Sequence, residues 1–144
     1  MKKILSLILT TISLSACADS KQIIQFSQLP QAAQTLVATY AADEPIAVIV
    51  MDKELLDTDY EVRFSNGNEW KFDKSGAIES LDNQLSPLPM ELIPAAIVAY
   101  VNQYFPNQGI REYSVDRRDY EITLMSGLEL TFNKSFQVIE TDLD

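Results

Sequence analysis

The sequence predicts an α+β fold of two tandem repeats, each with one helix packed on an antiparallel sheet of about four strands. First, DYEVRFSNGNEWKFDKSG (59–76) nearly recurs as DYEITLMSGLELTFNKSF (119–136). Residues 59–78 and 119–138 are identical at 8 of 20 positions. Second, an apolar stripe at helical spacing precedes each copy. Third, each copy alternates polar and apolar residues around a short turn, which is typical of a β-hairpin.

The N-terminus resembles a bacterial lipoprotein signal peptide. Lys2 and Lys3 precede the apolar run ILSLILTTISL (4–14), which is too short to span a bilayer as a mature helix. The run ends in Leu-Ser-Ala-Cys, and Cys17 is the sole cysteine of the chain. We therefore expect a signal peptide over residues 1–16 and lipid on Cys17, which anchors the protein to a membrane. The alternative is an ordinary secretory signal cleaved nearby, which leaves an incidental cysteine.

The charge of the mature chain opposes two classes of partner. Without Lys2 and Lys3, 9 Lys and Arg face 21 Asp and Glu, a net charge of −12. Such an excess opposes electrostatic binding of nucleic acid or of anionic lipid headgroups. The acidic residues are spread along the chain, which is typical of a solvated surface.

A helix opens each repeat. Apolar residues recur at i, i+4, i+7, i+8 and i+11 in both copies, namely Leu29, Ala33, Leu36, Val37 and Tyr40, then Ile93, Ile97, Tyr100, Val101 and Tyr104. Pro30 and Pro94 stand where a first helical turn tolerates proline. The breakers ADEP and PNQG end the two helices.

A set of short strands follows each helix. The hairpins turn at Asn66-Gly67 and at Ser126-Gly127. A strand is expected before each hairpin (46–53 and 110–116), and a short one after each (77–81 and 136–141). Phe72 and Phe132 are expected to be equivalent core residues, and Tyr60, Tyr120 and Trp70 also fall on apolar faces.

The predicted organisation divides the chain into five parts. A tether (17–26) follows the signal peptide, and a linker with two prolines (83–89) joins repeat 1 (27–82) to repeat 2 (90–144). Each repeat is near the lower size limit for independent folding, so the two are expected to share a sheet or pack end to end.

The helix that opens with Leu-Pro or Ile-Pro, followed twice by the pattern DYE…G.E..F, resembles the PepSY-like proteins. More narrowly, it resembles the beta-lactamase-inhibitor-like group of exported proteins from Gram-negative gut bacteria. The resemblance covers roughly residues 27–141. It implies the fold of the beta-lactamase inhibitory protein, in which two tandem units make a concave sheet backed by helices, and the concave face holds an enzyme. The second copy departs from the pattern where Phe136 replaces Gly76.

The residue inventory opposes catalysis. The chain has no histidine, which excludes Ser-His and Cys-His nucleophiles and the usual zinc sites. We expect no enzyme activity, no cofactor and no metal. The densest acidic cluster, Asp52, Glu54, Asp57, Asp59 and Glu61, is either a weak cation site or, as we favour, a solvated surface.

The polar faces of the hairpins form the candidate site. The residues expected to point away from the helices are Glu61, Arg63, Glu69 and Lys71 in repeat 1 and Glu121, Thr123, Met125, Glu129 and Thr131 in repeat 2. Such a face is either merely solvated or binds a protein. We therefore expect a non-enzymatic envelope lipoprotein, facing the periplasm, that binds or inhibits another exported protein through this face. The alternative is a structural or accessory lipoprotein without an inhibitory target.

Overall fold

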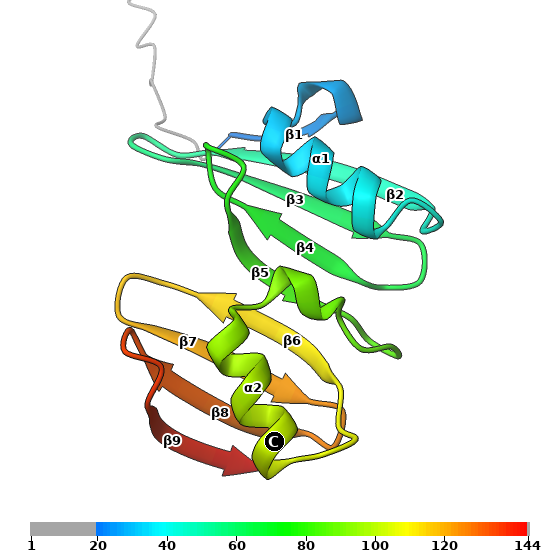
Figure 1. Ribbon diagram of the computed structural model, residues 1–144. Coiled ribbons are helices and arrows are strands. Elements are labelled where there is room, and N and C mark those ends of the chain that lie inside the picture. The colour runs from blue at the N-terminus through cyan, green and yellow to red at the C-terminus, as the bar shows by residue number, and fades with distance from the viewer. Residues whose placement is uncertain (1–19, 144) are drawn as a thin grey trace, which may run out of the picture.

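A computed structural model describes residues 20–143 as a single nine-stranded antiparallel sheet with two helices on one side (Figure 1). The strands lie in chain order from β1 to β9, and each pairs with its sequence neighbours. The strands are β1 (Ser20–Ile24), β2 (Ile46–Lys53), β3 (Thr58–Phe64), β4 (Glu69–Phe72), β5 (Ile78–Asp82), β6 (Ile110–Val115), β7 (Asp119–Leu124), β8 (Leu128–Asn133) and β9 (Val138–Leu143). The helices are α1 (Gln31–Tyr40) and α2 (Ala95–Tyr104), preceded by short 3-10 turns η1 (Phe26–Gln28) and η2 (Met90–Leu92).

The expectation of an α+β fold with two tandem helix-on-sheet repeats is wrong. The strands form one continuous sheet and the described residues contain only two α-helices, so the fold is mostly β. The physical reason lies at β5 and β6, which pair directly through Ser80 with Ser114, Leu81 with Tyr113 and Asp82 with Glu112. This pairing satisfies backbone groups that two separate sheets would leave as exposed edges.

The segment assigned to a tether contains a strand. Residues Ser20–Ile24 form β1, which pairs with β2 from Ser20 opposite Lys53 to Ile24 opposite Ile49. The sequence SKQII shows little alternation of polar and apolar residues. An edge strand tolerates this because it pairs with a neighbour along only one of its two edges. The last strand also starts later than expected, at Val138, because residues 134–137 form a turn.

The core lies between the two helices and one face of the sheet. Ala33 and Val37 of α1 and Ile97 and Val101 of α2 are buried, as the helical stripes predict. The strands contribute a single continuous cluster whose most buried members are Val62, Phe72, Leu81, Ile122, Leu124, Leu130 and Phe132. Phe72 and Phe132 are both fully buried, and Trp70 is 3% exposed. Tyr60 and Tyr120 are partly buried against this cluster.

Candidate functional site

The candidate site is the open face, the side of the sheet that neither helix covers. Val62 and Trp70 point into the core, so their strand neighbours point to the other side. In β3 and β4 the outward positions pair as Glu61 opposite Lys71 and Arg63 opposite Glu69. Alternation along the two strands therefore brings these four predicted residues together.

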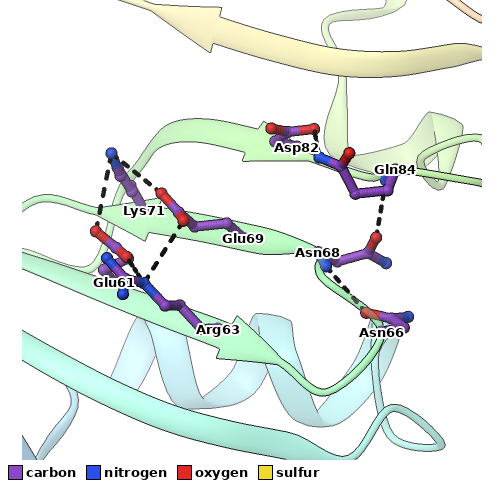
Figure 2. A network of polar contacts seen from close by, with 8 residues as sticks. All are labelled: Glu61, Arg63, Asn66, Asn68, Glu69, Lys71, Asp82 and Gln84. Atoms are coloured by element: carbon purple, nitrogen blue, oxygen red, sulfur yellow. Dashed lines mark hydrogen bonds and ion pairs between the residues drawn. The ribbon is translucent and has the colours of Figure 1, made fainter.

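These four side chains form an alternating network of charges (Figure 2). Arg63 Nε donates to Glu61 Oε1 and lies 3.6 Å from Glu69 Oε2. Lys71 Nζ lies 3.2 Å from Glu69 Oε1 and 3.8 Å from Glu61 Oε2. The hydrogen bond from Arg63 to Glu61 raises the pKa of the guanidinium. Exposed pairs stabilise a fold by only about 0–1 kcal/mol each, so the network mainly balances charge on this half of the face.

A second polar group borders the network at the β3–β4 turn (Figure 2). Asn68 is buried, accepts the backbone N–H of Gln84 at 2.9 Å and donates its own N–H to Asn66 Oδ1 at 3.0 Å. Gln84 Nε2 donates to Asp82 Oδ1 at 3.1 Å. These bonds hold the turn against the segment that follows β5, and so fix the rim of the open face.

The other half of the open face is acidic. Glu121 and Glu129, both predicted, point outward from β7 and β8 beside Thr131. The pairing of β8 with β9 adds Asp142 opposite Glu129 and Glu140 opposite Thr131. These five residues line a depression of about 200 Å³. Among the described residues, no Lys or Arg occupies an outward position on β7, β8 or β9.

Two predicted residues of the face differ from the others, because one is buried and one lies at the rim. Thr123 is only 2% exposed, and its hydroxyl donates to Glu112 Oε2 at 3.3 Å. Met125 lies just beyond the end of β7, where its N–H donates to the carbonyl of Gly109 at 2.9 Å. Met125 is 40% exposed. It therefore belongs to the rim of the face and not to its centre.

Four residues at the centre of the face were not predicted from the sequence. Ser80 and Asp82 of β5 and Glu112 and Ser114 of β6 line a depression of about 190 Å³ together with Glu69, Lys71, Glu121 and Thr123. Their alternation is visible in IESLD and IREYSV, but their place at the centre follows from the β5–β6 pairing. Sequence alternation alone could have identified them as outward residues.

The acidic cluster at Asp52–Glu61 lies on β2, on β3 and on the turn between them, next to the edge strand β1. Asp52 lies opposite Asp59, and Lys21 Nζ lies 3.4 Å from Asp52 Oδ2. The Oδ1 atoms of Asp52 and Asp59 are buried, with no hydrogen-bond partner in the described structure. Burial raises the pKa of Asp59, and the charges of Asp57, Asp52 and Asp73 raise it further. Residues 20–143 contain no group of three or more His, Cys, Asp or Glu that could hold a metal ion.

Two features bear on membrane attachment. Cys17, the expected lipidation site, lies outside the described residues. Within residues 20–143, neither helix is long and apolar enough to cross a membrane.

Comparisons with known proteins agree with this architecture. A family model described as "Putative beta-lactamase-inhibitor-like, PepSY-like" matches residues 58–140. A crystal structure described as a "putative periplasmic protein" of the DUF2874 family from Bacteroides vulgatus ATCC 8482 is 36% identical, with a TM-score of 0.83, over 87% of this chain and 98% of that one. A "putative calcium-regulated periplasmic protein" from Bacteroides thetaiotaomicron is 36% identical, with a TM-score of 0.80, over 85% of this chain and 96% of that one. A further "putative periplasmic protein of unknown function" from Bacteroides vulgatus ATCC 8482 is 25% identical, with a TM-score of 0.78, over 85% and 99%. No curated protein matches the chain.

Proposed function

Because the chain belongs to the beta-lactamase-inhibitor-like, PepSY-like family, we propose that it is a non-enzymatic periplasmic protein that binds another exported protein through its open sheet face. The observation that carries this proposal is that, within residues 20–143, the sheet is nine strands wide and both helices lie on one side of it. A polar face that no helix covers is available to a partner along its whole width. The likeness of this family to beta-lactamase inhibitors favours a protein partner.

The charge pattern narrows the class of partner. The network of Glu61, Arg63, Glu69 and Lys71 balances its own charge, whereas Glu121, Glu129, Glu140 and Asp142 gather on the other half. Complementary charge speeds association and selects among partners. We therefore propose that the partner places Lys or Arg side chains over β7–β9.

We also propose that the protein is a lipoprotein. The Leu-Ser-Ala-Cys ending of the signal-like segment supports lipid on Cys17, and the periplasmic neighbours support export. Mass spectrometry of the native protein is expected to find acyl chains on an N-terminal Cys17. An unmodified thiol, or a mature N-terminus elsewhere, would contradict the anchor and leave the binding proposal intact.

The binding proposal is tested by reversing charge on the acidic half of the face. Glu121 and Glu140 are both exposed, so the double change Glu121→Lys and Glu140→Lys should shift the free energy of unfolding by no more than about 0.5 kcal/mol per site. Purified parent and variant, cross-linked in envelope extracts, are compared for the proteins they capture. The parent is expected to capture a specific protein that the variant loses.

A matched control tests whether a loss of binding comes from the open face or from the change in net charge. The double change Asp43→Lys and Glu91→Lys alters the charge equally, at exposed positions in the α1–β2 loop and in η2. This control is expected to keep the partner. If both variants capture it at the parental yield, the open face is not the binding surface, and the alternative of an accessory lipoprotein without an inhibitory target is favoured.

A further inference from the structure

One end of the sheet gathers features that no part of the proposed binding face uses. The start of β1 and four turns lie together at this end: residues 54–57, 73–77, 116–118 and 134–137 (Figure 1, left side). We call this set the anchor edge. The sheet is a meander, so every second turn falls at the same end. The hairpin turns at Asn66-Gly67 and Ser126-Gly127 lie at the opposite end.

The anchor edge carries two strongly exposed leucines. Leu55 and Leu56, at the tip of the β2–β3 hairpin, are 88% and 89% exposed. Ser20 pairs with Lys53, so the first described residue of the chain lies beside this tip. Ser20 lies three positions after Cys17 in the sequence, and three residues span at most about 10 Å. Lipid on Cys17 would therefore hold the leucine tip at the bilayer surface.

The anchor edge also presents basic side chains. Its turns contain Lys74, Arg117, Arg118 and Lys134, all exposed, whereas in the described structure the turns and connecting loops at the opposite end contain no Lys or Arg. Lys134 lies over the ring of Tyr120, 4.1 Å from its centroid.

Two of these turns also carry a carboxylate that accepts hydrogen bonds from neighbouring backbone groups. Asp73 accepts hydrogen bonds from the backbone N–H groups of Ser75 and Ala77, and Asp116 accepts them from those of Arg118 and Asp119. Glu54 and Asp57 flank the leucines at the hairpin tip, so acidic as well as basic side chains lie along this edge.

We propose that the anchor edge lies against the lipid bilayer, with Leu55 and Leu56 in the interface and the basic turns at the level of the phospholipid headgroups. This inference rests on the proposed lipidation of Cys17. One lipid attachment gains stability from a second membrane contact, which exposed leucines and clustered Lys and Arg can supply. A bilayer fits this edge better than a protein partner because the proposed anchor ends beside the leucine tip. The strands then rise from the membrane, and the open face stays free for its partner.

Site-specific fluorescence tests the orientation on the full lipoprotein. Acylation consumes the thiol of Cys17, so a single introduced cysteine takes the label. Leu56→Cys and Ser135→Cys report on two turns of the anchor edge. Leu85→Cys and Ser126→Cys are matched controls at the opposite end, since Leu85 is 87% exposed and Ser126 is also exposed. Each variant is placed in vesicles of phosphatidylethanolamine and phosphatidylglycerol, with or without lipids brominated on the upper acyl chain.

The expected result is that bromolipids remove most of the emission at position 56, reduce it at position 135, and leave positions 85 and 126 unchanged. Equal quenching at all four positions, or none at position 56, would overturn the proposed orientation. Quenching at 56 but not at 135 would overturn contact along the whole edge. Mass spectrometry of the same samples separates the causes. An acylated but unquenched protein refutes this inference alone, whereas an unmodified Cys17 refutes the anchor and this inference together.

Discussion

Gly76 and Phe136 occupy equivalent turns, yet the two positions are under different constraints. Both have a left-handed backbone, with φ of 84° and 60°. A Cβ at Gly76 would lie 2.9 Å from the backbone nitrogen of Ala33, whereas the ring of Phe136 stacks on Tyr120 at 5.1 Å. The first turn therefore needs glycine because α1 packs directly on it, and the second turn accepts the cost of positive φ in a bulky residue.

The change Gly76→Ala is expected to destabilise the protein by roughly 1–3 kcal/mol, because it combines positive φ with a backbone collision. Thermal or denaturant unfolding measures the loss. Phe136→Ala is the comparison, since this position already carries a Cβ and loses only its ring contacts. A Gly76→Ala variant that unfolds like the parent would show that α1 does not approach this turn closely.

Asp59 carries a charge that the folded state disfavours. Burial, followed by the charges of Asp57, Asp52 and Asp73, raises the pKa of Asp59 above its ordinary value of 3.8. The Asp59 carboxyl therefore ionises more readily in the unfolded state than in the folded state. The protonated carboxyl stabilises the folded state below pH 3.8, and this stabilisation is lost as the pH rises through the folded pKa. At pH 7 Asp59 is ionised in the parent protein, so its charge destabilises the folded state to the full extent.

The change Asp59→Asn is accordingly expected to raise the melting temperature at pH 7, and the gain should shrink as the pH falls towards the ordinary pKa. Melting curves recorded across this range measure the effect. Asp43→Asn, in the exposed α1–β2 loop, controls for the loss of one charge. A gain that does not change with pH would rule out titration of Asp59 as its cause.

At the scale of elements, Phe72 in β4 and Phe132 in β8 play the same part. Each is fully buried and pairs across its hairpin, with Tyr60 and Tyr120 respectively. Truncation of either to Ala is expected to cost about 3–5 kcal/mol, a large share of a typical total of 5–15 kcal/mol. Chemical denaturation of the two variants should therefore show similar, large losses. Unchanged stability in both would mean that the inward face of the hairpins has been misassigned.

At the scale of the whole molecule, β5 and β6 join the two halves into one structure. Leu81 is 1% exposed and pairs with Trp70 on one side and Tyr113 on the other. The buried residues form one cluster across this junction. A continuous core favours all-or-none unfolding.

Calorimetry is therefore expected to show one unfolding transition, with equal calorimetric and van't Hoff enthalpies. Leu81→Ala should lower this transition as a whole, by about 2–5 kcal/mol, without splitting it. Two transitions in the parent, or a loss confined to one half by hydrogen exchange, would show that the halves fold separately.

The sequence by itself determined the local elements. Periodicity located α1 and α2, and alternation around Asn66-Gly67 and Ser126-Gly127 located both hairpins and the outward direction of residues such as Glu61 and Lys71. These features depend on contacts between residues close in the chain, so a short window of sequence contains the signal.

Tertiary structure alone decided how the halves combine and how deep each outward residue lies. The β5–β6 pairing, the β1 edge strand and the burial of Thr123 depend on segments that are distant in the sequence. Alternation specifies the side of a strand that a residue occupies, but not which strand lies next to it. The centre of the open face, at Ser80 and Ser114, therefore emerged only when the two hairpins were joined into one sheet.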